Sequence, residues 1–199
     1  MLRRFVCWLF ALLAPAAAAA PAQIDVRREA GAFVVQATVD LEADQRTAWL
    51  TLTDYEHLPQ FVPGIQSARV LARTGSGRTE RLLVEQTGEF RFLVFAEPVQ
   101  VWLDVTHEAP ARVLARSVLP SGVDPERSTL RDFEGSYALS ALDAVRTRLV
   151  YRARFEPLRT MLPLLGTVVV RHAVTEQFEA MAAEIERRAA RRRTEQAAR

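Results

Sequence analysis

The chain has 199 residues, of which 49% are hydrophobic and 25% are charged, a composition that excludes a disordered chain. Its 26 basic residues are all arginines and exceed the 24 acidic residues by two, so the formal net charge is only +2. A chain this close to neutral has little general attraction for nucleic acid. The length fits one domain of ordinary size.

The N-terminal 22 residues have the three parts of a secretory signal peptide. Residues 3–4 are arginines, residues 5–13 are an unbroken apolar run, and small residues follow. Ala20 and Ala22 match the Ala-x-Ala pattern, so we expect cleavage before Gln23, with cleavage before Ala20 as the alternative. A spanning helix needs about 20 apolar residues, more than this run provides, and an uncleaved membrane anchor is the second alternative. We therefore expect export to a bacterial periplasm.

The positions of cysteine and arginine indicate further divisions of the chain. The only cysteine, Cys7, lies in the signal peptide, so the mature chain can form no disulfide and has no cysteine nucleophile. Residues 187–199 hold six arginines and one glutamate. They predict either a solvated helix end or a transient contact with anionic membrane headgroups. The expected division is a signal peptide over 1–22, a ligand-binding domain over 23–188 and a basic C-terminal tail over 189–199.

The first elements of the mature chain follow from its hydrophobic pattern. Apolar and polar residues alternate over 33–41, which predicts a strand with one buried face. Asp44 then predicts the N-cap of a short helix that runs through Leu52. Residues 55–58 precede a Pro and Gly cluster, and this short segment predicts a turn or a second short helix.

The middle of the chain predicts a meander of about six strands, separated by turn residues. Gly88 lies inside one strand pattern and predicts a bulge, and Pro98 predicts a corner. Residues 119–128 predict a loop. The expected strands cover 68–73, 79–86 with a continuation over 90–94, 99–105, 112–118, 130–139 and 148–155.

The end of the chain changes to a helical period. Apolar residues spaced by three and four positions predict a helix from about residue 164 towards residue 188, with one face formed by Val170, Val174, Phe178, Met181 and Ile185. This face needs a cover, and a curved sheet is the natural partner. We therefore expect an α+β fold in which an antiparallel sheet of about six or seven strands wraps round a long C-terminal helix, with two short helices after the first strand.

Three segments resemble the START-like (SRPBCC) superfamily, whose fold is called a helix-grip. The first covers 48–65 and contains Asp54-Tyr55 and a Phe61-x-Pro63 turn. The second covers 131–139, with the pattern Phe-x-Gly-x-Tyr-x-Leu, and the third starts at 147–151 and continues into Phe-x-Pro and the terminal helix. The closest branch is the bacterial polyketide cyclase/dehydrase and lipid-transport group, which also contains coenzyme Q-binding proteins. The resemblance implies an internal pocket for an apolar ligand, and no universal catalytic motif.

Candidate catalytic groups are few. His57, His107 and His172 show no metal-ligand spacing, and no nucleophile elbow or phosphate-binding loop is present. Asp104 and Asp132 lie on predicted strands, where an inward carboxylate could act as an acid, although outward and solvated positions are expected. We therefore assign no catalytic residue, no metal and no cofactor.

Aromatic residues are the candidate ligand-binding residues, because an apolar ligand needs apolar walls with a few polar groups. Core packing is the alternative for each of them. The predicted function is binding or transport of a lipid, quinone or polyketide-like molecule, with gates near 55–65 and 119–128. The alternatives are an aromatase/cyclase-like enzyme with the same pocket and a periplasmic protein-interaction module. The ligand-binding candidates are Tyr55, Phe61, Phe90, Phe92, Trp102, Phe133 and Tyr137.

Overall fold

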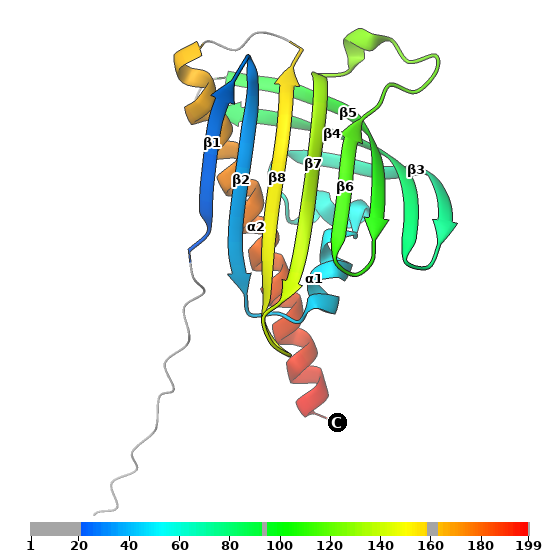
Figure 1. Ribbon diagram of the computed structural model, residues 1–199, viewed down its shortest axis with the longest axis vertical. Helices are drawn as coiled ribbons and strands as arrows, with labels where there is room; N and C mark the ends of the chain where they lie inside the picture. Colours follow the sequence, from blue (N-terminus) through cyan, green and yellow to red (C-terminus); the bar gives the residue numbers. More distant parts are fainter. Residues whose placement is uncertain (1–20, 93–94, 159–162, 199) are drawn as a thin grey trace, which may run out of the picture.

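A computed structural model describes residues 21–92, 95–158 and 163–198. It has one antiparallel sheet of eight strands in the order β1-β2-β8-β7-β6-β5-β4-β3, and the long helix α2 runs along its inner face (Figure 1). Short helices link β2 to β3 beside the lower half of α2. This arrangement confirms the predicted helix-grip fold. The predicted signal peptide falls almost entirely outside the described residues.

The elements follow the predicted order. The strands are β1 (Gln23–Glu29), β2 (Ala32–Leu41), β3 (Ile65–Ser76), β4 (Thr79–Phe92), β5 (Phe95–Glu108), β6 (Arg112–Ser117), β7 (Leu130–Ala141) and β8 (Thr147–Pro157). The helices are α1 (Gln45–Leu52), α2 (Pro163–Ala197) and the 3-10 helices η1 (Tyr55–Gln60) and η2 (Pro125–Arg127). Asp44 caps α1 as predicted, since its carboxylate accepts the backbone N–H of Thr47 at 2.9 Å.

The sheet has one strand more than the sequence predicted, because β1 was missed. This edge strand pairs with β2 along its whole length, from Gln23 opposite Thr38 to Glu29 opposite Ala32. Only Ile24 and Val26 of β1 pack against the core. Two apolar residues give a weak alternation, so the strand is stabilised by pairing with β2 more than by its own pattern.

Two predicted interruptions are wrong. β4 and β5 pair without a register shift, so neither a bulge at Gly88 nor a corner at Pro98 breaks them. The bulge lies on the neighbouring strand, where the β3–β4 register shifts after Ile65. Gly88 has a different role: a Cβ atom there would lie 2.0 Å from the Gly64 carbonyl oxygen. The backbone before β3 therefore crosses β4 at a distance that only glycine permits.

Helix α2 continues past the predicted end of the domain, to Ala197, and has 35 residues. Its arginine-rich end is bonded to the body of the protein. Arg192 donates to the Thr47 hydroxyl at 3.0 Å, and Arg193 donates to the Glu42 carbonyl at 3.0 Å. These bonds favour an anchored helix end over the solvated terminus that the sequence indicated.

The main core lies between the inner face of the sheet and α2. It joins alternate residues of the strands to one face of α2, including Phe178, Met181 and Ile185. Outside this core, arginines and acidic residues pair across the outer face. Within the described part of the chain, no helix combines the length and hydrophobicity that crossing a bilayer requires.

Candidate functional site

The centre of the inner sheet face carries a pair of tyrosines. Tyr137 of β7 and Tyr151 of β8 are directly opposite in the register, and their rings stack at a centroid distance of 4.6 Å. Phe178 of α2 lies 6.5 Å from the Tyr151 ring, so the pair faces the helix. Both side chains are half buried. Packing therefore fixes two polar tips inside an otherwise apolar layer.

The motif Phe-x-Gly-x-Tyr on β7 explains how the wall beside this pair is built. A Cβ atom at Gly135 would lie 2.6 Å from the tip of the Phe133 ring. The ring of Phe133 therefore folds over Gly135 on the inner face, next to Tyr137. Phe133 contacts both hydrophobic clusters of the interior. The glycine is required by this ring position, since any larger residue would displace the ring.

A second polar group lies at the α1 end of the interior. The Tyr55 hydroxyl is 2.8 Å from Nε2 of His107, and Nδ1 of His107 is 3.4 Å from the carboxylate of Glu80. Arg73 pairs with the same carboxylate at 2.9 Å. Trp49 of α1 contacts the His107 ring edge-on at 5.4 Å. Arg73, Glu80, His107 and Tyr55 thus form a continuous chain from the surface to the interior.

Burial decides the protonation of this chain. A carboxylate accepts only, so the neutral His107 ring carries its proton on Nδ1 and Nε2 accepts the Tyr55 proton. Burial lowers the pKa of His107, although Glu80 opposes that shift. Burial also raises the pKa of Tyr55, and the nearby Tyr137 adds to the increase. The inner end of this series, His107 and Tyr55, is consequently neutral, with no phenolate and no imidazolium.

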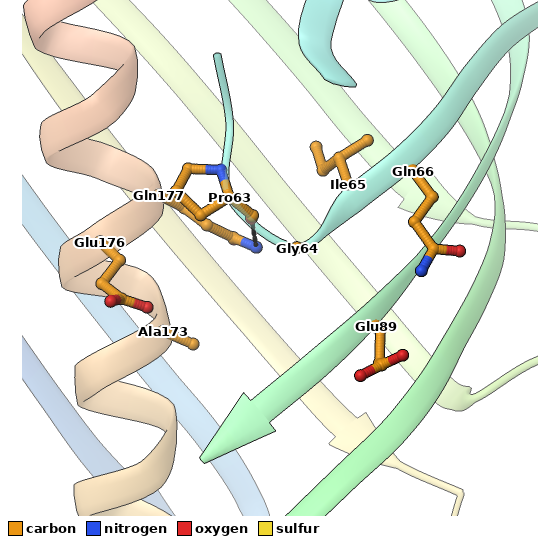
Figure 2. A pocket seen from close by; sticks show the side chains of 8 residues that line it. All are labelled: Pro63, Gly64, Ile65, Gln66, Glu89, Ala173, Glu176 and Gln177. Atoms are coloured by element: carbon orange, nitrogen blue, oxygen red, sulfur yellow. Dashed lines mark hydrogen bonds between the residues drawn. The ribbon is translucent and has the colours of Figure 1, made fainter. Parts of the chain in front are cut away.

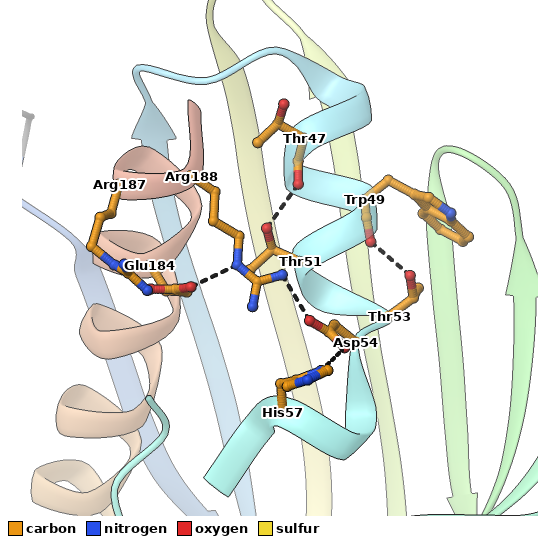
Figure 3. A network of polar contacts seen from close by, with 9 residues as sticks. All are labelled: Thr47, Trp49, Thr51, Thr53, Asp54, His57, Glu184, Arg187 and Arg188. Carbon is orange, nitrogen blue, oxygen red and sulfur yellow. Dashed lines mark hydrogen bonds and ion pairs between the residues drawn. The ribbon is translucent and has the colours of Figure 1, made fainter. Parts of the chain in front are cut away.

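A third network anchors α2 to the short helices (Figure 3). Arg188 of α2 donates to Glu184 at 2.6 Å and to Asp54 at 2.8 Å, and Asp54 also contacts His57 Nδ1 at 2.6 Å. Arg187 pairs with the other oxygen of Glu184. The Arg188 guanidinium lies 5.3 Å from the centre of the Phe61 ring. His57 therefore belongs to a structural network rather than to a reaction site.

The seven predicted ligand-binding residues do not share one location. Phe133 and Tyr137 lie together on the inner face, and Tyr55 joins the same core from η1. Phe61 packs at the edge of the core, against Arg188. Phe90 and Phe92 are in register with the inner face of β4, and their side chains lie outside the described residues.

Trp102 is separated from the others. Its neighbours Val101 and Leu103 pack in the main core, so alternation along β5 directs Trp102 to the outer face. It is only 3% exposed, and Arg127 lies 5.7 Å from the centre of its ring. The predicted loop gate at 119–128 thus contains Arg127, which lies over a residue of the outer face.

The two strand aspartates point outward, as expected. Asp104 pairs with Arg81 at 2.5 Å and Arg116 at 2.8 Å. The hydrogen bond from Arg81 lowers the pKa of Asp104 to about 2, so this carboxyl cannot serve as a general acid. Asp132 lies 3.5 Å from Arg154 and is half exposed.

A pocket of about 350 Å³ opens where α2 passes the turn before β3 (Figure 2). Its wall includes Pro63–Gln66, of which Pro63–Ile65 belong to the first predicted gate. The side chain of Gln177 closes one side of the pocket by donating to the Pro63 carbonyl at 3.1 Å. The carboxylates of Glu89 and Glu176 also line it. The pocket is therefore more polar than the interior that it borders.

The fold and the inner-face site define a class: a START-type helix-grip protein. Among solved structures, the chain is similar to a START superfamily protein from Mycobacterium smegmatis, with 17% identity over 77% of this chain and 97% of that one, at a TM-score of 0.63. It is similar to the STAR-related lipid transfer protein of Xanthomonas axonopodis, with 14% identity, coverage of 81% and 98%, and a TM-score of 0.58. It is also similar to the Zhui aromatase/cyclase of Streptomyces, with 17% identity, coverage of 79% and 95%, and a TM-score of 0.57.

Sequence comparison gives the family directly. The family model for polyketide cyclase/dehydrase and lipid transport matches residues 41–182. The chain belongs to this family. No curated protein matches the sequence. Because the structural relatives are distant in sequence, they establish the fold, and the ligand has to be argued from this chain's own residues.

Sequence reasoning missed two features of the site. It gave no role to His107, because alternation along one strand does not reveal which side chain another element will meet. It omitted Tyr151 from the candidates, although Tyr151 occupies the same inward row as Leu149 and Ala153. Alternation along β8 could have identified Tyr151, because residues 149, 151 and 153 lie on the same face of the strand.

Proposed function

We propose that the protein binds or carries a hydrophobic small molecule between the inner face of the sheet and α2. One observation carries the proposal: half-buried tyrosines retain accessible surface within a layer that is otherwise apolar. A lipid, quinone or polyketide-like molecule would find apolar contacts there, and burying about ten methylenes contributes on the order of 8 kcal/mol before the entropy of binding is subtracted. No catalytic residue is needed for this role.

The pocket beside Pro63–Gln66 supports an entry route. It lies at the border of the interior, between the turn before β3 and α2. Movement of this turn requires breaking the bond between Gln177 and the Pro63 carbonyl, and the Glu89 N–H bond to Gly64 at 2.8 Å. Two hydrogen bonds are few enough for local opening without loss of the sheet.

An aromatase/cyclase-like enzyme is the second candidate, and the Glu80–His107–Tyr55 arrangement favours it. General acid–base chemistry needs a group that can reach the substrate and exchange a proton near neutral pH. Nε2 of His107 is already occupied by Tyr55, and burial raises the pKa of Tyr55. These two facts place binding ahead of catalysis. Loss of polyketide turnover in His107→Gln, with ligand affinity retained, would reverse that order.

A protein-interaction module, the third candidate, has no observation of its own. The exposed large apolar side chains found among the described residues are spread over α1, β3, the segment after β6, the β7–β8 turn and α2, at Leu50, Leu71, Val118, Leu119, Leu142, Val145 and Val168. An interaction surface would gather such residues in one patch.

Export to the periplasm is part of the proposal. It is supported by the signal-like pattern of the first 22 residues and by the start of β1 at Gln23, the expected first residue after cleavage. Membrane-surface contact through the C-terminal arginines is also proposed, with a restriction. Arg188, Arg192 and Arg193 already bond to the body, so headgroups would compete with those bonds.

The test is native mass spectrometry with lipid extraction on the mature protein, purified from its own periplasm. An unrelated periplasmic protein prepared in parallel serves as the control for adventitious lipid. A lipid or quinone that copurifies at near one molecule per protein supports the proposal. An empty protein that also takes up no added lipid or quinone contradicts it.

A further inference from the structure

The hydroxyls of Tyr137 and Tyr151 differ from the other buried polar groups. In the described part of the chain, every fully enclosed side-chain nitrogen or oxygen has a hydrogen-bond partner. The Tyr55 hydroxyl, for example, is bonded to His107. Neither Tyr137 nor Tyr151 makes a hydroxyl hydrogen bond to a described residue. Each hydroxyl must therefore reach accessible space, which agrees with the half-buried state of both side chains.

The two side chains belong to the side of the sheet that α2 covers. The two residues occupy the middle of β7 and β8, with Val113 of β6 beside Tyr137 and Ala37 of β2 beside Tyr151. Burial raises the pKa of Tyr137 to about 12 and raises that of Tyr151 further. The hydroxyls therefore keep their protons and act as neutral hydrogen-bond donors.

A hydroxyl that reaches accessible space without a protein partner keeps its hydrogen-bonding capacity for water or for a ligand. Phenylalanine would pack against the same apolar neighbours, so a pair of such donors side by side is difficult to explain by packing alone. The stacking of the two rings at 4.6 Å brings both donors into one small region. The arrangement suits one acceptor atom that meets both hydroxyls.

The surroundings select the chemistry of the acceptor. The inward neighbours along both strands are Phe133, Gly135, Leu139, Leu149 and Ala153, and none is charged. The series from Arg73 to Tyr55 contains one cation, Arg73. It lies on the exposed end of β3 and is paired with Glu80. A carboxylate or phosphate here would be buried without a counter-charge, which is strongly unfavourable. A neutral carbonyl oxygen needs only donors.

We infer that Tyr137 and Tyr151 form the polar subsite of the ligand pocket and hold a neutral carbonyl oxygen of an otherwise apolar ligand, such as a ketone, a quinone or an ester. This inference rests on the proposed function, since it requires a ligand in the interior. It narrows the ligand class: anionic lipids would have to keep their charged groups outside this subsite.

The test uses three twelve-carbon probes that differ only in their polar group: methyl decyl ketone, dodecane and dodecanoate. Their affinities are measured by displacement of the neutral dye Nile red from the mature protein. The double variant Tyr137→Phe/Tyr151→Phe removes both hydroxyls. Ser136→Ala is the matched control, because it removes a hydroxyl from the same strand on the opposite face.

Loss of the two hydroxyls should weaken ketone binding about 3- to 10-fold and leave dodecane unchanged, since a net hydrogen bond is worth about 0.5–1.5 kcal/mol. Ser136→Ala should bind all three probes like the wild type. A second measurement needs no variant. The infrared carbonyl band of isotope-labelled ketone bound to the wild type should lie at the lower frequency of a hydrogen-bonded carbonyl.

The outcomes separate the two proposals. Equal ketone binding by wild type and double variant, or an unshifted carbonyl band in the bound ketone, overturns the subsite and leaves the carrier function standing. Dodecanoate binding that is tighter than ketone binding and that weakens in the double variant also overturns it, because the carboxylate would then occupy the subsite. If the wild type binds neither Nile red nor any probe, the proposed function itself fails, and the subsite fails with it.

Discussion

The interior contains two tyrosine regions whose hydroxyls differ in their bonding: Tyr55 near α1, and Tyr137 with Tyr151 at the centre of the sheet. Near α1, Tyr55 is bonded to His107, which is held in turn by Glu80. At the centre, Tyr137 and Tyr151 stack on each other and leave their hydroxyls without a bond to the described protein. The first region satisfies its polar groups internally and so contributes rigidity. The second retains hydrogen-bonding capacity, which a structural role alone does not use.

The largest expected effect comes from Tyr55→Phe. It removes the partner of His107 Nε2 in a region where His107 is only 5% exposed. An unsatisfied buried acceptor costs about 1–3 kcal/mol, so the free energy of unfolding should fall by about 2 kcal/mol. Denaturant titration followed by circular dichroism measures it. A change below about 0.5 kcal/mol would show that this end is not internally satisfied.

The pH dependence of stability gives an intermediate effect. His107 faces Tyr55 from η1, Trp49 from α1, and Glu80 and Arg73 from the neighbouring strands. Burial lowers the pKa of His107 below its ordinary value of 6.5, so the unfolded chain binds this proton more readily than the folded one. Stability is therefore complete above pH 6.5 and declines below it, by at most about 1.4 kcal/mol per pH unit.

Denaturation midpoints measured between pH 7.5 and about pH 5 test this slope, above the range in which carboxylates titrate. The decline should vanish in His107→Gln and persist in His172→Gln, whose side chain is half exposed on α2. A wild-type stability that stays flat over this range would mean that His107 accepts a proton inside the fold without penalty.

The smallest effect is expected at the two central tyrosines. Tyr137→Phe and Tyr151→Phe each delete a hydroxyl that has no partner in the described protein, so each should leave the free energy of unfolding of the ligand-free protein within about 0.5 kcal/mol of wild type or raise it. The same chemical change thus has opposite consequences at Tyr55 and at the central pair. A loss of 1 kcal/mol or more at either central position, with ligand removed, would indicate a hidden structural hydrogen bond.

Much of this architecture was predictable because it depends on local pattern. Alternation over 33–41 predicted β2, and the three- and four-residue spacing from Val170 to Ile185 predicted the buried face of α2. Asp44 predicted the start of α1, since its side chain bonds three residues ahead. The motif around Phe133 and Gly135 indicated the helix-grip fold before any contact was known.

The site was less predictable, because it depends on which side chains meet. Trp102 and Tyr137 are both strand aromatics, yet they lie on opposite faces because the strand period places them so. Sequence alone gave no reason to join His107 to Tyr55, which is 52 residues away. The sequence predicted a bulge at Gly88. The true reason for this glycine is its close contact with the Gly64 carbonyl, which belongs to a different segment and could not be foreseen from the strand pattern.

The sequence by itself determined the class of fold, the order of its elements and the apolar character of its interior, since these follow from periodicities within single segments. The tertiary structure decided which polar groups are satisfied and which remain open to a ligand. Hydrogen bonds in the interior join residues far apart in the chain, and only the register of the sheet against α2 and η1 brings them within reach. That register pairs Tyr55 with His107 and leaves Tyr137 and Tyr151 facing the interior.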